Sequence, residues 1–167
     1  MLWVMEGFTS YYDELLLYRA GYYTKDQYLN KLFGTINYVE SLPGNKVQPV
    51  AHASFDAWIK AYRPNENSRN TTISYYSKGS IIAALLDLKI IEHTNGQKNL
   101  DNFLQALYAQ YKKTGSGLTE ETFIETLEEF TGNIDSFYKT YVFGTTEIPY
   151  EDFFTVVGIE TTKEEST

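Results

Sequence analysis

Few side chains in this chain of 167 residues could carry out chemistry. The chain has no cysteine, which excludes thiolate metal sites, thiol nucleophiles and disulfide scaffolds. His52 and His93 are the only imidazoles, and neither has a partner at the four-residue spacing of a helical zinc pair. There is no GxSxG nucleophile elbow, no phosphate-binding glycine loop and no EF-hand spacing. A self-contained active site cannot be assembled from these residue types.

The first informative motif is Glu6-Gly7-Phe8, within the string LWVMEGFTSYY at residues 2–12. It resembles the helix by which gluzincin aminopeptidases supply their third zinc ligand. In thermolysin-like enzymes two histidines of an HExxH helix and this glutamate hold zinc, and water takes the fourth position. The resemblance implies that Glu6 is a zinc ligand. The alternative is an acid that merely flanks the apolar stripe of Met5, Phe8 and Tyr12.

The second motif is the string SYYSKGS at residues 74–80, which resembles the YxKG segment of related zinc aminopeptidases. There the tyrosine hydroxyl faces the scissile carbonyl, and this implies that Tyr76 donates a hydrogen bond to the oxyanion of the tetrahedral intermediate. Such a donor contributes about 3 kcal/mol of transition-state stabilisation. Tyr75 is the rival, and the spacing to Lys78 and Gly79 favours Tyr76. We interpret Lys78 and Gly79 as residues of the helix start and its close packing.

Longer strings extend the resemblance over most of the chain: ASFDAWIKAYRPNENS at 53–68, the apolar IIAALLDL, and PYEDFFTVVGIE near the end. Together they resemble the PDZ-bearing glycyl aminopeptidase family of zinc metallopeptidases. This implies a parent protein with a thermolysin-like catalytic domain, followed by a PDZ domain, that removes N-terminal residues such as Gly or Ala from peptides. Arg63 could meet a carboxylate of the peptide substrate, and the alternative is a salt bridge at a helix end or in a loop.

The chain departs from this pattern because it contains no HExxH. A single carboxylate cannot hold zinc or provide a metal-bound nucleophile, so we expect neither stoichiometric zinc nor peptidase activity in this chain alone. We interpret residues 1–157 as the C-terminal helical lobe of the catalytic domain, and residues 158–167 as an acidic tail or linker toward an absent PDZ domain. A short paralogue that serves as a noncatalytic binding or scaffolding module is the alternative.

The elements that must position these residues are helices. Apolar residues recur at helical spacing, and no period-2 alternation or repeat indicates a sheet. Gly21 ends the first helix, and Thr24 with Gln27 forms a capping-box pattern at the start of the second. The third is the most hydrophobic and is expected to be central. The five main helices are predicted at 2–20, 24–41, 81–91, 99–113 and 119–130, and short ones at 54–62, 135–142 and 150–156.

Composition agrees with one all-α globular domain, since 43% of residues are hydrophobic, 16% aromatic and 22% charged. From residue 118 onward there are twelve acids and two bases, a field that disfavours nucleic acid. No apolar run is long enough to predict a membrane span. Expected partners are the missing half of the catalytic domain, the PDZ domain and, through the parent, a peptide; self-association through the exposed cleft face is a further option. The sequence shows no signal peptide and does not indicate a cellular compartment. Export of the parent protein is compatible with this sequence.

Overall fold

The computed structural model describes residues 1–163, and every regular element among them is helical. The all-α prediction is confirmed. The last four residues of the expected acidic tail, 164–167, lie outside the described residues. None of the described helices is long and apolar enough to cross a membrane.

The chain forms two compact units. The first comprises Met1–Ala84 with Asp135–Glu147, and the second comprises Leu85–Ile134 with the residues from Ile148 onward. The first unit contains α1 (Leu2–Arg19), α2 (Lys25–Glu40), the 3-10 turn η1 (Pro43–Lys46), α3 (Val50–Phe55), α4 (Ser68–Thr71), the first half of α5 (Tyr75–His93), α8 (Asp135–Phe137) and the π-helical turn η2 (Tyr138–Val142). The second contains the rest of α5, α6 (Leu100–Thr114), α7 (Glu120–Thr131), α9 (Tyr150–Phe154) and η3 (Thr155–Val157).

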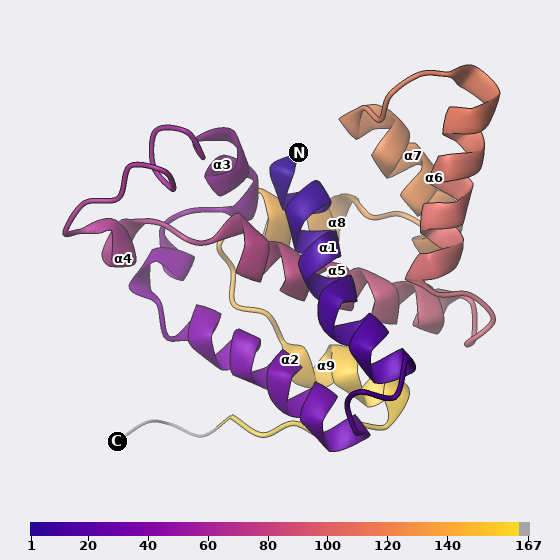
Figure 1. Ribbon diagram of the computed structural model, residues 1–167, viewed down its shortest axis with the longest axis horizontal. Helices are drawn as coiled ribbons and strands as arrows, with labels where there is room; N and C mark the ends of the chain where they lie inside the picture. The colour runs from indigo at the N-terminus through magenta and orange to yellow at the C-terminus, as the bar shows by residue number, and fades with distance from the viewer. Residues whose placement is uncertain (164–167) are drawn as a thin grey trace. The chain divides into compact units, whose positions relative to one another are not determined.

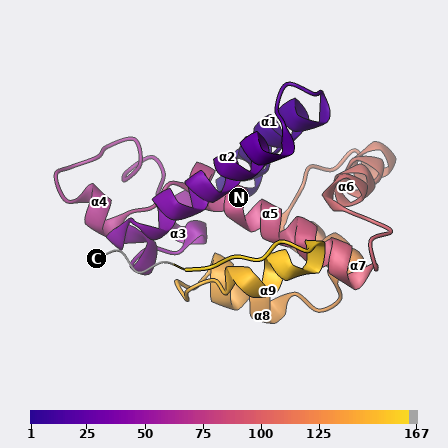
Figure 2. The same cartoon turned by 90° about the horizontal axis from the view of Figure 1, so that it is seen from below.

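In the first unit, α1 and α2 form a helical hairpin (Figures 1 and 2). Its turn has the predicted chemistry: Gly21 has a φ of +80°, which glycine adopts without strain. Thr24 then caps α2, because its hydroxyl accepts from the backbone N–H of Gln27 and the Gln27 side chain accepts from that of Thr24. The predicted bounds of both helices are confirmed to within about one residue.

The start of α1 is stabilised by a residue far along the chain. The backbone N–H of Trp3 donates to the hydroxyl of Ser54 in α3, at 3.1 Å, and both residues are buried. Because the first N–H groups of a helix have no partner within it, Ser54 acts as a cap supplied by tertiary packing. The Trp3 ring contacts Phe8 and Tyr138 edge-on, which places it in the core of the first unit.

The helix α5 is longer than predicted, because it begins at Tyr75 and not near Ile81. Ser74 provides the earlier start: its hydroxyl accepts from the backbone N–H of Ser77 at 3.3 Å. The YxKG segment therefore forms the first turns of this helix. The prediction of a short helix at 54–62 was wrong as well, because α3 ends at Phe55 and is followed by turns. The residue before the first residue of α3 is Pro49, and a proline is tolerated at the start of a helix.

In the second unit, α6 and α7 pack side by side, joined by a loop (Figure 1). Their shared core is aromatic, with the Phe103 ring in edge-on contact with those of Phe123 and Phe130. The start of α7 has a capping box formed by Thr119 and Thr122. The Thr122 hydroxyl accepts from the backbone N–H of Thr119, so a threonine performs the role usually given to an acid.

The buried carboxylate of Asp87 stabilises the start of α6, since it accepts from the backbone N–H of Leu100 at 2.7 Å. Replacing it by Ala would leave that donor buried and unpaired. We expect Asp87→Ala to lower the free energy of unfolding by about 2 kcal/mol, and Asp87→Asn, which keeps an acceptor oxygen, by about 1 kcal/mol or less. Urea titration followed by circular dichroism measures both. Equal losses in the two variants would contradict this role for the hydrogen bond.

Candidate functional site

The two motifs singled out in the sequence meet where α1 crosses α5 (Figure 1). The contact is made by two glycines: a Cβ on Gly7 would lie 2.5 Å from the Cα and the carbonyl carbon of Gly79. A Cβ on Gly79 would lie 2.6 Å from the carbonyl oxygen of Trp3. Side chains other than hydrogen therefore cannot occupy either position without moving the backbones apart. The close packing predicted for Gly79 is confirmed, and its partner is the glycine that follows Glu6.

Glu6 and Tyr76 are brought near each other by this crossing. Glu6 is half-buried on α1, and Tyr76, in the first turn of α5, is 38% exposed. The pKa of Tyr76 is raised above its ordinary value, first by the nearby Tyr62 and further by partial burial and by the negative charge of Glu6, while Tyr75 offsets part of the rise.

Tyr75, the rival of Tyr76 in the sequence, has a different environment. It is 2% exposed, and its hydroxyl lies 3.0 Å from that of Tyr62. Burial, and then hydrogen bonds with Tyr62 and Tyr76, raise its pKa well above the ordinary value. Tyr75 is thus a core residue that stays protonated, whereas the neighbouring Tyr76 reaches solvent.

Tyr62 is a site residue that the sequence analysis did not single out. It lies in the turns after α3, where its ring stacks on that of Trp58 with centroids 5.0 Å apart. Its hydroxyl is hydrogen-bonded to that of the buried Tyr75. The four-residue spacing of Trp58 and Tyr62 was the available signal, but nothing in it indicates which tyrosine the loop will reach.

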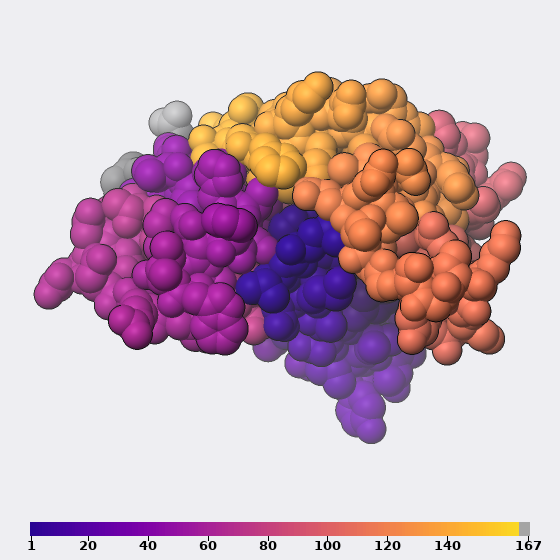
Figure 3. All heavy atoms as spheres, turned by 90° about the horizontal axis from the view of Figure 1, so that it is seen from above, coloured from indigo at the N-terminus to yellow at the C-terminus, as the bar shows by residue number. Residues whose placement is uncertain are grey.

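The loop that carries Tyr62 exposes several large apolar side chains. Figure 3 shows this part of the chain, in purple to magenta, at the surface beside the indigo start of α1. Two opposite charges of this loop form an ion pair, in which the Lys60 ammonium lies 2.6 Å from the Asp56 carboxylate. The exposed side chains are Phe55 at 89%, Trp58 at 74%, Ile59 at 70% and Tyr62 at 55%. Such a cluster is unusual on a solvated surface.

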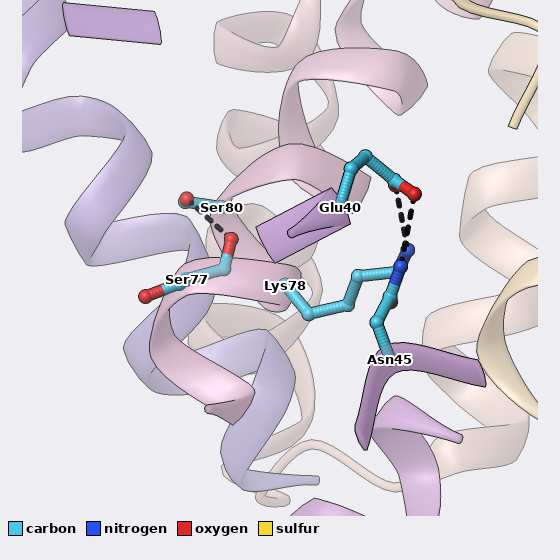
Figure 4. A network of polar contacts seen from close by, with 5 residues as sticks. All are labelled: Glu40, Asn45, Ser77, Lys78 and Ser80. Carbon is cyan, nitrogen blue, oxygen red and sulfur yellow. Dashed lines mark hydrogen bonds and ion pairs between the residues drawn. The ribbon is translucent and has the colours of Figure 1, made fainter. Parts of the chain in front are cut away.

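A buried ion pair holds the other side of the first turns of α5 (Figure 4). The ammonium of Lys78, a residue only 7% exposed, lies 3.7 Å from the carboxylate of Glu40 at the end of α2. The side-chain amide of Asn45, in η1, donates to the same carboxylate at 3.0 Å. Burial lowers the pKa of Lys78, and Glu40 offsets part of that effect. This network joins α2 and η1 to α5 two residues after Tyr76.

Among the described residues, the remaining sequence candidates make no contact with the residues of this crossing. Arg63 is exposed, and its side chain has no ion pair within the described part of the chain, so the alternative of a salt bridge is not observed there. His52 and His93 are also exposed. Among residues 1–163 no three side chains of the metal-binding types form a cluster. The described residues therefore do not fit a complete zinc site, and Glu6 could supply one ligand at most.

The glycine contact predicts a specific asymmetry between two substitutions. Gly7→Ala must separate α1 from α5, and we expect it to lower the free energy of unfolding by about 2 kcal/mol. Gly34→Ala is the matched control, since this helical glycine of α2 has nothing within 4 Å of a built Cβ. Alanine there should raise the free energy of unfolding by about 0.5–1 kcal/mol. Urea denaturation of both variants checks this, and two stabilised variants would refute the close crossing.

The lowered pKa of Lys78 predicts how stability depends on pH. Between that lowered value and the ordinary value of about 10.5, the unfolded chain binds a proton that the folded chain does not. The contribution of Lys78 to the free energy of unfolding therefore increases as the pH rises through this interval. Denaturant titrations from pH 8 to about 10.5 should show a steeper increase in the wild type than in Lys78→Met. The exposed Lys113→Met should match the wild type, and identical slopes for all three would contradict the shift.

Comparison with known proteins points to peptidases. The sequence model of the M61 glycyl aminopeptidase family matches residues 1–82, which include Glu6, Tyr76 and both glycines of the crossing. Among solved structures, an aminopeptidase N family protein from Idiomarina loihiensis matches with a TM-score of 0.86 and 33% sequence identity. That match covers 93% of this chain but only 27% of the Idiomarina protein. No curated protein matches. The chain is thus similar to M61 glycyl aminopeptidases in the residues that build the crossing. Over 93% of its length its fold is similar to about a quarter of a much longer aminopeptidase N family protein.

Proposed function

We propose that this chain is the C-terminal helical lobe of the catalytic domain of a zinc aminopeptidase of the M61 glycyl aminopeptidase family. In this assignment Glu6 is one zinc ligand and Tyr76 donates a hydrogen bond to the oxyanion of the tetrahedral intermediate. The family match over residues 1–82 and the likeness to the Idiomarina protein support the assignment.

The observation that carries it is the glycine crossing, which packs the helix that bears Glu6 against the helix that bears Tyr76, a residue seventy positions later in the sequence. A metal ligand and an oxyanion donor must both lie close to one reacting carbonyl, so they have to converge on one side of the fold. The close approach of α1 and α5 at Gly7 and Gly79 supports such a convergence. If Glu6 were only a surface acid and Tyr76 only a structural ring, no such convergence would be needed.

The protonation of Tyr76 also suits a hydrogen-bond donor. Because its pKa is raised above the ordinary value for a phenol, Tyr76 carries its proton throughout the neutral range. A neutral hydroxyl can donate to a developing negative charge, whereas a tyrosinate would repel it. Tyr75 is a weaker candidate for this role, because its buried hydroxyl has little access to a substrate.

The rest of the site would come from outside the described residues. A catalytic zinc site needs three protein ligands and an open position for water, and Glu6 is a single carboxylate. The Idiomarina protein is several times longer than the matched region, which leaves room for the missing ligands in a related polypeptide. Hydrolysis of N-terminal residues, with a preference for Gly or Ala, belongs to the proposal through the family description, and Arg63 stays a candidate for contact with the peptide.

The test begins with the gene. In the reading frame upstream of the codon for Met1 we expect an HExxH motif; a natural start codon with nothing before it would favour a noncatalytic helical module. The full-length protein is then assayed for zinc by mass spectrometry and for hydrolysis of alanine p-nitroanilide. We expect Glu6→Gln to weaken zinc binding by more than about 10-fold. Tyr76→Phe should keep the zinc and lower kcat by about 100-fold.

The matched controls are Glu121→Gln and Tyr108→Phe, which alter an exposed acid and an exposed tyrosine of the second unit. Both should retain zinc content and kcat. Full zinc binding and activity in Glu6→Gln, or an unchanged kcat in Tyr76→Phe, would refute the corresponding assignment.

A further inference from the structure

The exposed segment after Ser54, residues 55–62, is named the apolar loop, and hydrogen bonds tie it to both helices of the crossing. At its start, the Ser54 hydroxyl accepts from the backbone N–H of Trp3, in the first turn of α1, at 3.1 Å. At its end, the hydroxyl of Tyr62 lies 3.0 Å from that of Tyr75, the first residue of α5. Figure 3 shows this part of the chain beside the start of α1. The loop is therefore fixed against α1 at one end and against α5 at the other.

Each of these ties lies next to a residue of the proposed catalytic site. Trp3 is three residues before Glu6, which is nearly one helical turn. Tyr75 directly precedes Tyr76, and the two rings are in contact, with centroids 4.8 Å apart. One residue of an extended peptide spans about 3.3 Å, so a peptide whose scissile carbonyl meets Tyr76 brings its neighbouring residues within reach of the loop.

The side chains that the apolar loop presents to solvent are large and apolar. Four of them are more than half exposed: Phe55, Trp58, Ile59 and Tyr62. The rings of Trp58 and Tyr62 stack with centroids 5.0 Å apart, and the two charged side chains among them, Asp56 and Lys60, form an ion pair with each other. Exposed apolar surface of this kind marks binding sites, because covering it releases water from apolar groups.

The proposed reaction decides which part of a peptide this surface can accept. An aminopeptidase leaves one residue on the acyl side of the scissile bond, and in the proposed function that residue is Gly or Ala. Its side chain has at most one methyl group with which to contact the apolar loop. The residue after the scissile bond has no such limit, so its side chain is the one that can cover several aromatic and aliphatic groups.

We propose that the apolar loop binds the side chain of the residue that follows the scissile bond. The preferred substrates are then peptides with a small first residue and a large apolar second residue. Trp58 and Ile59 supply the contact area, while Tyr62 holds the loop against Tyr75. This inference deepens the proposed function and rests on it, since only the assignment of Tyr76 places a scissile bond here.

The test compares Ala-Phe-amide and Ala-Gly-amide as substrates of the full-length protein. Both lack a free carboxylate, so an ion pair with Arg63 cannot contribute to the comparison. We expect kcat/KM of the wild type to be at least about 10-fold higher for Ala-Phe-amide. Trp58→Ala and Ile59→Ser should each lower this preference by at least about threefold, mainly by raising KM for Ala-Phe-amide. Tyr22→Ala, which removes a similarly exposed ring from the turn after α1, should keep the wild-type preference.

The results separate this inference from the proposed function. Equal kcat/KM for the two peptides in the wild type would overturn the role of the loop, although hydrolysis of both would uphold the peptidase assignment. The same holds if both loop variants keep the wild-type preference, or if Tyr22→Ala loses it to the same extent. If the zinc-loaded wild type hydrolyses neither peptide, the proposed function itself is wrong, and the inference fails with it.

Binding is also measurable without turnover, through the fluorescence of Trp58 in zinc-depleted full-length protein. The difference between the wild type and Trp58→Phe isolates this emission, and Trp58 is 74% exposed whereas Trp3 is 1% exposed. We expect acrylamide to quench the emission of Trp58, and Ala-Phe-amide to protect it at concentrations at which Ala-Gly-amide does not. If Trp58 is already protected before peptide is added, a second copy or another part of the polypeptide covers the loop, and the inference is wrong.

Discussion

The contact between Gly7 and Gly79 sets how closely α1 and α5 can approach. Glycine in a helix interior lowers stability by about 1 kcal/mol relative to alanine, so two glycines at one crossing call for a structural explanation. The explanation is that the two backbones touch with no side chain between them. Glu6 lies beside the first glycine and Tyr76 one turn before the second, and the negative charge of Glu6 contributes to the raised pKa of Tyr76.

The same crossing is supported from both sides by polar side chains that come from distant segments. Ser54 pairs the otherwise free N–H of Trp3 at the start of α1, and Lys78 is held by Glu40 and Asn45 near the start of α5. Burying such groups is favourable only when they are paired, so these bonds fix the positions of α3, α2 and η1 against the crossing. The geometry around Glu6 and Tyr76 is therefore determined by most of the first unit.

The neighbouring tyrosines Tyr62, Tyr75 and Tyr76 differ in how far their side chains are exposed to solvent. Tyr75 and Tyr76 are adjacent in sequence, yet successive residues of a helix point about 100° apart, so one ring enters the core and the other reaches the surface. Both Tyr75 and Tyr76 keep their protons, because the pKa of each is raised, that of Tyr75 chiefly by burial and that of Tyr76 chiefly by Tyr62. An exposed aromatic loop beside these tyrosines combines a hydrogen-bond donor with apolar contact area, a combination typical of small binding sites.

The sequence by itself determined the local features of this protein: the helical class, the capped start of α2, the glycine that ends α1, and the motifs that contain Glu6 and Tyr76. These depend on residues within a few positions of one another, whose periodicity and capping chemistry are visible in one dimension. Only the tertiary structure decided which residues meet across long separations. The Ser54 cap, the glycine crossing and the arrival of Tyr62 at Tyr75 join residues whose types alone are compatible with many partners. Such contacts depend on how whole helices pack, and no local pattern specifies that.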